Sequence, residues 1–532
     1  MVGKATTQRI KITGLRLPVA KTPALQDALA HALAVPVESI SCVQILRRSL
    51  DARQRTLHYE YSIAADVILS NDEREHVLSN PKVNLYQDAS LPGPESQITI
   101  QHRPIVVGAG PAGLFAALGL LERGCPPIVI ERGGPISDRI EEVQGFWKEG
   151  VLDPESNVVF GEGGAGAFSD GKLTSRGTSP FKQKVLEALV ACGADETILY
   201  DARAHMGTDR LRQVIPALVE RLRKQGVEFH FNTRMDDILV KKGRLQGIET
   251  TDGKIATGLL VLAVGHSARD TVRMLAKQGM RLQTKGFAVG VRIEHPQALI
   301  DSTMYCDEHA GRLAGAADYA VRHADAVSGR GVYSFCMCPG GMVIGCSSQP
   351  GTLCVNGMSF SNRAAAHANA ALVVTVSPDD FTGANVLGGI ELQERIEQQA
   401  YSAGSQPYFA PAQRAADFIA GRKSSDQSLA GLSFQPGVTS CDLAGLLPGF
   451  TVEPLRRALH AFDTKISGFI EQGVLIGVET RTSSPVRMLR DPDTFQSADI
   501  AGLVPVGEGA GYAGGIVSSA VDGLRAVWAV SC

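Results

Sequence analysis

The feature that most constrains the fold is a strand–glycine–helix unit over residues 104–124, PIVVGAGPAGLFAALGLLERG. Apolar residues at 105–107 predict a buried strand, and three glycines follow it at the spacing G-x-G-x-x-G. The first glycine permits a tight turn, the second lets a phosphate approach the backbone, and the third lets the helix pack closely on the sheet. The helix N-terminus then offers unpaired N–H groups and a positive dipole end to an anion. The residues predicted to hold a dinucleotide pyrophosphate are Gly108, Ala109, Gly110, Pro111, Ala112 and Gly113.

A second strand, predicted over residues 127–130, ends in Glu131, with Arg132 directly after it. A carboxylate at this position can accept hydrogen bonds from both ribose hydroxyls of an adenosine, and it repels a 2′-phosphate. Three glycines at this spacing are weak support by themselves. Here strand, glycines, helix, strand and acid follow one another in order, which favours a dinucleotide site over a merely structural glycine turn.

A second glycine-rich segment, GLVPVGEGAGYAGGIVSSAVDG, covers residues 502–523. A strand end, a tight turn at Gly507-Glu508 and a helix beginning at Gly514-Gly515-Ile516 resemble the second FAD motif of the glutathione-reductase-like flavoproteins. The resemblance implies that the cofactor is FAD, that Glu508 contacts the ribityl–phosphate region, and that the helix N-terminus faces the flavin pyrimidine. A positive dipole end at that place would stabilise the negative charge of a reduced flavin.

The same resemblance places the adenine against the backbone near Met235, after a predicted strand in residues 226–233. It also matches the apolar strand at 259–265, whose last residue, Gly265, returns the chain towards FAD. Residues 236–257 alternate as a β-meander between these two strands. No second G-x-G-x-x-G follows a strand, so the sequence predicts no dedicated NAD(P) domain and leaves NAD(P)H as a transient electron donor.

Further segments resemble a narrower bacterial family of FAD-dependent dehydrogenases with no assigned substrate. They lie at residues 49–53, 161–176, 265–269, 333–341, 479–485 and 507–515. Segment 161–176, GEGGAGAFSDGKLTSR, is dense in glycine, which lets a backbone lie flat against a ligand. The resemblance implies that Gly164 and Gly166 run beside the isoalloxazine ring, with Lys172 as the nearest cation. A surface loop is the alternative interpretation.

The fold class predicted is α/β, with a Rossmann-like FAD-binding domain, an inserted α+β substrate domain and a small N-terminal ferredoxin-like α+β module. The N-terminal module, residues 1–95, shows a βαββαβ order of patterns and ends in a linker at 91–94. The FAD-binding domain is predicted over 96–279 and 473–532, and the substrate domain over 280–472. Within the latter, strands at 332–337 and 342–347 are expected to flank a turn at 339–341.

Composition excludes several functional classes. The 52 Lys and Arg residues nearly balance the 55 Asp and Glu residues, so bulk charge does not favour a nucleic-acid partner. Apolar runs are too short to span a membrane, and 10 cysteines in 532 residues are too few for a disulfide scaffold. No residues have metal-ligand spacing. The sequence therefore predicts a cytoplasmic protein, and it does not define the oligomeric state.

Candidate catalytic residues are Lys172, His266 and Arg481. His266 is considered as an acid/base group, and Arg481 with Arg487 as a clamp for a carboxylate. Cys336-x-Cys338 is open to two interpretations, a redox pair or two inert strand residues. The second is favoured because both side chains of a regular strand would share one face, which is poor disulfide geometry.

The function predicted is an FAD-dependent oxidoreductase that passes hydride through flavin N5 to or from a small-molecule substrate. The alternative is a flavin-binding regulatory or RNA-associated protein, suggested only by an excess of basic residues in the N-terminal module.

Overall fold

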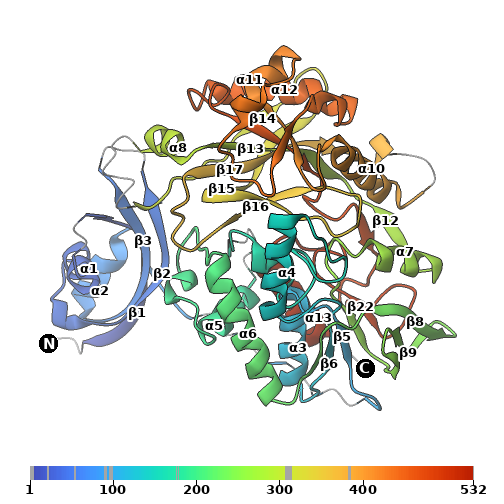
Figure 1. Cartoon of the computed structure of the whole chain (residues 1–532). Helices are drawn as coiled ribbons and strands as arrows, with labels where there is room; N and C mark the ends of the chain where they lie inside the picture. The colour runs from blue at the N-terminus through green and yellow to red at the C-terminus, as the bar shows by residue number, and fades with distance from the viewer. Residues whose placement is uncertain are drawn as a thin grey trace.

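The structure is a computed structural model that describes residues 5–20, 23–52, 56–88, 91, 93–94, 97, 100–174, 177, 179–305, 314–381 and 385–530. The predicted boundary at residues 95–96 and part of the predicted linker lie outside these residues. Figure 1 shows three regions, a small N-terminal unit at one side, a parallel sheet with its helices below, and a large antiparallel sheet above.

The N-terminal unit is an antiparallel sheet with the strand order β2-β3-β1-β4, covered by two helices. Side chains alternate between the two faces of this sheet, so Ile10 and Ile12 of β1 and Ile63 of β3 all face the helices. Arg48 anchors the unit to the rest of the chain through two hydrogen bonds to Asp201, of 2.6 and 2.8 Å. The elements are β1 (Thr6–Pro18), α1 (Leu25–Leu33), β2 (Ile40–Asp51), β3 (His58–Leu69), α2 (Asn71–Ser79) and β4 (Val83–Leu85).

A five-stranded parallel sheet, in the order β22-β11-β5-β6-β7, forms the middle of a three-layer unit. Because side chains alternate along each strand, Val106 points to the helices while Ile105 and Val107 point to an antiparallel meander. The strands are β5 (Ile105–Val107), β6 (Ile128–Ile130), β7 (Glu228–His230), β11 (Leu260–Leu262) and β22 (Leu503–Pro505), and the meander is β8 (Met235–Lys241), β9 (Arg244–Thr250) and β10 (Gly253–Ala256). The meander is where the sequence predicts it.

Helices cover the other face of the parallel sheet and connect it to the rest of the chain. Those on this face are α3 (Pro111–Glu122), α5 (Phe181–Val190), α6 (Thr208–Lys224) and α13 (Ile516–Ala529), whereas α4 (Ile136–Glu149) packs against the large sheet and α7 (Arg269–Lys277) packs on the meander side. Among them α3 and α13 pack most closely, side by side (Figure 1). A Cβ on Gly119 would lie 2.5 Å from the Val527 side chain, and one on Gly523 would lie 2.1 Å from the Ala112 carbonyl oxygen. Glycine at both positions therefore permits this close approach.

The large sheet has the order β14-β15-β17-β13-β20-β18-β19, with β16 paired to β15. One face is apolar and is covered by helices, while the other carries polar side chains. On β13, Val289, Val291 and Ile293 enter the apolar core, and Arg292 points to the opposite face. The strands are β13 (Phe287–Pro296), β14 (Arg322–Ala324), β15 (Gly331–Gly345), β16 (Val355–Ser359), β17 (His367–Val376), β18 (Ala410–Arg414), β19 (Val438–Ser440) and β20 (Val474–Glu479).

Among the described residues four helices accompany this sheet, and a two-stranded ribbon links it to the parallel sheet. The helices are α8 (Gln297–Met304), α10 (Gly388–Ala403), α11 (Ala415–Ala420) and α12 (Gly449–Asp463), and the ribbon is β12 (Leu282–Thr284) with β21 (Val486–Met488). None of the helices that the structure describes is both long and apolar enough to cross a membrane.

Two sequence predictions for this region are wrong. The segment 339–341 is not a turn between two strands, because β15 runs through it without reversing. Gly340 is needed for another reason: a Cβ there would lie 1.7 Å from the Arg363 carbonyl oxygen, so a neighbouring segment crosses close by. The large sheet also extends past the predicted boundary at 472, because β20 pairs with β13 and β18.

Candidate functional site

The first glycine loop joins β5 to α3, and its glycines differ in what surrounds them. Gly108 has a φ of +105°, and a Cβ on Gly113 would lie 1.8 Å from the Gly108 carbonyl oxygen, so both are required by the fold. A Cβ on Gly110, in contrast, would meet only the Gly164 Cα, at 3.7 Å. The space in front of the α3 N-terminus is therefore open at Gly110, as binding of a pyrophosphate requires.

Glu131 lies at the end of β6, as predicted, and connects two glycine loops. Its Oε2 accepts a hydrogen bond of 2.7 Å from the Ala109 N–H, and its Oε1 accepts one of 2.8 Å from the Gly161 N–H. Glu131 thus fixes both loops, a role that its position in the motif does not reveal. Oε1 also accepts a hydrogen bond of 3.1 Å from the Gly133 N–H, so Oε2 is the oxygen that retains capacity to accept a ribose hydroxyl.

A cavity of about 270 Å³ lies beside Glu131 at the carboxyl end of the parallel strands. Arg132 contributes to its wall, stacked 4.4 Å from the centre of the Phe160 ring. The backbone that leads into Met235 also borders it. The full lining is Arg132, Asp153, Glu155, Ser156, Asn232, Arg234 and Thr251. A larger cavity of about 480 Å³ lies at the amino ends of β5, β11 and β22, the opposite edge from the one where such sheets bind dinucleotides. The smaller cavity is therefore the one at the edge of the sheet where such folds bind dinucleotides.

The second glycine loop, residues 161–171, lies between the N-termini of α3 and α13. The Gly163 N–H donates to the Ala109 carbonyl oxygen at 2.9 Å, and the Gly164 Cα borders Gly110. A Cβ on Gly166 would lie 3.2 Å from the Ile516 side chain. The structure therefore brings together three segments that the sequence predicted separately for one cofactor.

The second dinucleotide motif completes the arrangement at α13. A Cβ on Gly507 would lie 2.8 Å from the Ala112 Cβ, so this turn packs directly on the start of α3. A Cβ on Gly514 or Gly515 would meet no atom within 4 Å, which leaves open space at the α13 N-terminus. Burial raises the pKa of Glu508 to about 7, against the opposing effects of Lys285 and the Gly515 amide. Gly265, at the return after β11, likewise faces open space.

These observations fit FAD in an extended form. The adenosine cavity, the open Gly110 and the open α13 N-terminus follow one another along the carboxyl edge of the parallel sheet. Glu131, Gly110 and the Gly514–Gly515 pair would hold the ribose, the pyrophosphate and the flavin pyrimidine in that order.

The three candidate catalytic residues have different surroundings. The Lys172 Nζ lies 3.1 Å from Asp170 Oδ2 and donates to the Met337 carbonyl oxygen. Burial lowers the pKa of Lys172, but the sulfur atoms of Cys338 and Cys336 and the Asp170 carboxylate raise it overall. Lys172 therefore remains a cation at the contact between the glycine loop and the large sheet.

Burial, followed by the charges of Arg269 and Arg481, lowers the pKa of His266 to about 3. Its Nε2 lies 3.3 Å from the Gln393 amide nitrogen. A histidine with this pKa is neutral near pH 7, which favours hydrogen bonding over acid catalysis.

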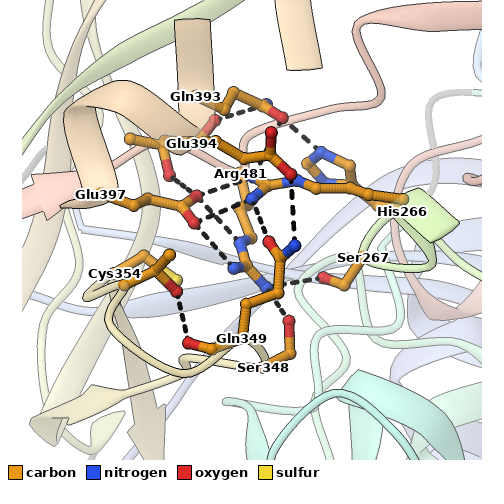
Figure 2. Close-up of polar contacts among 12 residues, drawn as sticks. His266, Ser267, Ser348, Gln349, Cys354, Gln393, Glu394, Glu397 and Arg481 are labelled. Atoms are coloured by element: carbon orange, nitrogen blue, oxygen red, sulfur yellow. Dashed lines mark hydrogen bonds and ion pairs between the residues drawn. The ribbon is translucent and has the colours of Figure 1, made fainter. Parts of the chain in front are cut away.

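Arg481 lies in a buried cluster with Arg269 and Glu397. Figure 2 shows Arg481 and Glu397 facing each other in this cluster. Glu397 accepts bidentate hydrogen bonds from Arg269, both of 2.8–2.9 Å, and from Arg481, of 2.9 and 3.1 Å. The carboxylate that Arg481 clamps is therefore one of the chain's own. Arg487 is not part of the cluster, since it lies over the Tyr512 ring at 5.3 Å.

The cluster joins the segment after β11 to α10, to the end of β15 and to the end of β20. Additional hydrogen bonds come from Ser267, Ser348, Gln349, Gln393 and Thr480. The sequence does not reveal Glu397, because it belongs to no motif. Glu397 lies on the same buried face of α10 as Gln393 and Ala400. This helical spacing is the signal that the sequence offers for its inward position.

Comparisons with known proteins match this chain to FAD-dependent families. The family described as an FAD-dependent protein, C-terminal domain-like, matches residues 286–482, and the FAD dependent oxidoreductase family matches residues 200–361. A domain of unknown function matches residues 9–66. The glycine loops, the acid after β6 and these matches define the chain as an FAD-dependent oxidoreductase.

The chain belongs to the same family as an uncharacterized protein of Clostridium beijerinckii. The two are 42% identical over 506 residues, which cover 94% of each chain. Protein FixC of Escherichia coli K12 is 28% identical over 213 residues, 39% of this chain and 46% of FixC.

Solved structures that a structural comparison matches to this chain include an L-amino acid deaminase of Proteus myxofaciens in complex with anthranilate. It shares 13% identity over 82% of this chain and 90% of that chain, with a TM-score of 0.32. CtdE in complex with FAD shares 12% identity over 80% of this chain and 82% of that chain, with a TM-score of 0.29.

Proposed function

We propose that the chain is a flavoenzyme of the glutathione-reductase-like type that transfers hydride between flavin N5 and a small organic substrate. The observation that carries the proposal is the convergence of the α3 and α13 N-termini on one glycine loop, through Gly110, Gly164 and Gly166. Bound there, FAD supplies hydride transfer; the chain's own residues position it. The substrate would reach the ring from the polar face of the large sheet, where Lys172 and Arg292 lie.

Under this proposal the chain is divided into three domains. Residues up to about 95 form a ferredoxin-like module, supported by their βαββαβ order and the strand order β2-β3-β1-β4. The FAD-binding part runs from about 96 to 279 and resumes after β20, rather than at 473. The large sheet between them is the substrate-binding part.

The direct test is cofactor release followed by anaerobic reduction. Denaturation of the purified protein is expected to release FAD, because the cavity lined by Arg132 would hold the adenosine that FMN lacks. Candidate small substrates are then added anaerobically, and bleaching of the flavin absorbance identifies a reductant. Release of FMN, or of no flavin, would contradict the proposal.

Placing a carboxylate at the α13 N-terminus is expected to make the flavin harder to reduce. Gly514→Asp suits this test because a Cβ there meets nothing within 4 Å and the residue has no left-handed φ. Its charge would oppose the negative charge of the reduced ring and lower the potential by roughly 20–50 mV. Gly514→Asn is the matched control, equal in size but uncharged. Identical potentials for the two variants, each with full FAD, would place the ring elsewhere.

NADPH is expected to form no tight one-to-one complex with the FAD-loaded protein. The motivation is the single strand–glycine–helix unit with a terminal acid in the sequence. Calorimetry with NADPH and NADP⁺ measures this directly. A stoichiometric site that persists in a variant altered at Gly164 would reveal a separate nicotinamide site.

A further inference from the structure

A buried glutamine on α10, Gln393, contacts three groups that differ in whether they donate or accept hydrogen bonds. Its Oε1 accepts a hydrogen bond of 3.2 Å from the Arg269 guanidinium, and its Nε2 donates one of 2.8 Å to the Thr480 carbonyl oxygen. The same Nε2 lies 3.3 Å from Nε2 of His266, a contact that Figure 2 shows. Gln393 is fully buried, so its amide depends on these three partners.

These contacts permit one orientation of the Gln393 amide. A guanidinium can only donate hydrogen bonds, and a carbonyl oxygen can only accept them. The reversed amide would turn its NH2 group towards Arg269 and its oxygen towards Thr480, which opposes donor to donor and acceptor to acceptor. Arg269 is held in place, because Glu397 accepts hydrogen bonds of 2.9 and 2.8 Å from it. The Gln393 NH2 group is therefore the one that faces His266.

This orientation decides which ring nitrogen of His266 carries its proton. Because the Gln393 NH2 group donates to Nε2, that nitrogen must be the acceptor. Burial lowers the pKa of His266 to about 3, so the imidazole is neutral near pH 7 and has a single N–H. The proton is therefore on Nδ1.

The Nδ1 atom of His266 faces the second dinucleotide motif. It lies 4.0 Å from Oε1 of Glu508, and the His266 side chain is only 8% exposed. This distance leaves no room for a bridging water, and a shift of about 1 Å would close it to a hydrogen bond. The backbone brings the same segments together, because a Cβ on Gly509 would lie 2.3 Å from the Gly265 carbonyl oxygen. The residue before His266 thus packs on the residue after Glu508.

We propose that His266 is a positioning residue of the cofactor site, with its proton fixed on Nδ1 by Gln393 and directed at the Glu508 carboxylate. The inference rests on the proposed function, in which Glu508 contacts the ribityl–phosphate region of FAD. A hydrogen bond from His266 restricts rotation of the Glu508 side chain before the cofactor binds and leaves other lone pairs for a ribityl hydroxyl. Through Gln393, α10 thereby supports the second dinucleotide motif.

A second buried histidine, His295, provides an internal comparison. Its Nε2 lies 2.8 Å from the Phe469 carbonyl oxygen, which can only accept, so the proton of His295 must be on Nε2. Burial lowers the pKa of His295 to about 4, so this imidazole is also neutral near pH 7. Its strand partner Ala368 belongs to the apolar core, which places His295 on the helix-covered face of the large sheet. His295 thus matches His266 in burial and charge but has the opposite tautomer.

The first measurement determines both tautomers by heteronuclear NMR of FAD-loaded protein with isotope-labelled histidine. Couplings from the carbon-bound ring protons show which ring nitrogen carries hydrogen. The proton is expected on Nδ1 in His266 and on Nε2 in His295, and the variants His266→Phe and His295→Phe assign the two signals by their loss. In Gln393→Met, which removes the donor, His266 is expected to show both tautomers. A proton on Nε2 of His266 in the wild type, or an unchanged tautomer in Gln393→Met, would overturn the proposal.

The second measurement compares Kd values for FAD, obtained by titrating FAD-free protein at about pH 8, above the pKa of Glu508 of about 7. His266→Phe is expected to bind FAD about 10-fold more weakly, since one hydrogen bond to a charged group is lost. His266→Asn retains an N–H donor near the position of Nδ1, so its Kd is expected to stay within about threefold of the wild type. His295→Phe is expected to leave the Kd unchanged. Melting temperatures recorded without FAD show whether each variant folds.

The outcomes separate this inference from the proposed function. Protein that binds no FAD would overturn both. Equal Kd values for the wild type and His266→Phe would overturn the positioning role alone. Equal weakening by His266→Phe and His266→Asn would overturn it as well, because the size of the ring rather than its N–H would then account for the effect.

Discussion

Gly110→Ala is expected to abolish retention of FAD while leaving the fold intact. A Cβ at Gly110 would lie 3.7 Å from its nearest neighbour, an ordinary contact, and the backbone angles of the residue suit alanine. The same Cβ would occupy the space of the pyrophosphate and block its hydrogen bonds to the α3 N-terminus. Loss of about 3 kcal/mol, roughly a 100-fold weaker Kd, follows from losing hydrogen bonds to a charged group. Flavin absorbance after gel filtration measures retention, and circular dichroism measures the fold.

Gly113→Ala is the informative contrast. Its Cβ would lie 1.8 Å from the Gly108 carbonyl oxygen, so the loop and helix cannot both keep their positions. This variant is expected to lose FAD and folding together. Full flavin occupancy in Gly110→Ala would show that the pyrophosphate does not approach this residue.

Glu397→Gln is expected to cost about 3–5 kcal/mol of unfolding free energy, because it leaves two buried guanidinium groups without their anion. Glu397 and Arg269 are almost fully buried, and Arg481 nearly so. Urea unfolding monitored by fluorescence measures the change. Glu394→Gln is the matched control on the same helix. Its partner Arg273 is 35% exposed, so the expected loss is below about 1 kcal/mol. Equal losses in the two variants would contradict the role assigned to the cluster.

The same carboxylate predicts a dependence on pH. Burial raises the pKa of Glu397, but Arg481 and Arg269 outweigh burial and hold it well below its usual range. A pKa lowered in the folded state gives stability that is complete above the unfolded value, about 4.3, and is lost as the pH falls below it. Wild-type stability is therefore expected to fall more steeply than that of Glu397→Gln between about pH 4.5 and 3.

The sequence predicted best those parts of the site whose residues are required locally. Gly108, Gly113 and Glu131 lie within one strand–helix–strand unit, where spacing alone defines their positions. The parallel strands and the meander followed in the same way from alternation and from short apolar runs. Residues 339–341 show the limit of this approach, because Gly340 avoids a contact with Arg363, a residue brought close only by tertiary structure.

The features that the sequence could not predict depend on contacts between distant segments. Glu397 is one glutamate among many until the fold places two arginines against it. At Cys336 the strand β15 contains one residue more than β17, and Arg292 and Lys172 from other elements donate to the Cys336 and Met337 carbonyl oxygens there. A pattern of alternating residues cannot reveal such a bulge, since it describes one strand without its neighbours.

The close packing of α3 on α13 has a consequence for how the protein is made. The proposed phosphate end of the site lies near residue 110 and the proposed flavin end near residue 515, and Gly119 and Gly523 let α3 and α13 pack in contact. A nascent chain from which α13 has not yet left the ribosome lacks the proposed flavin end of the site. It also lacks the helix that packs against α3. We therefore expect FAD to be captured only after synthesis has passed residue 529. Cells starved of riboflavin should then accumulate a full-length but protease-sensitive chain.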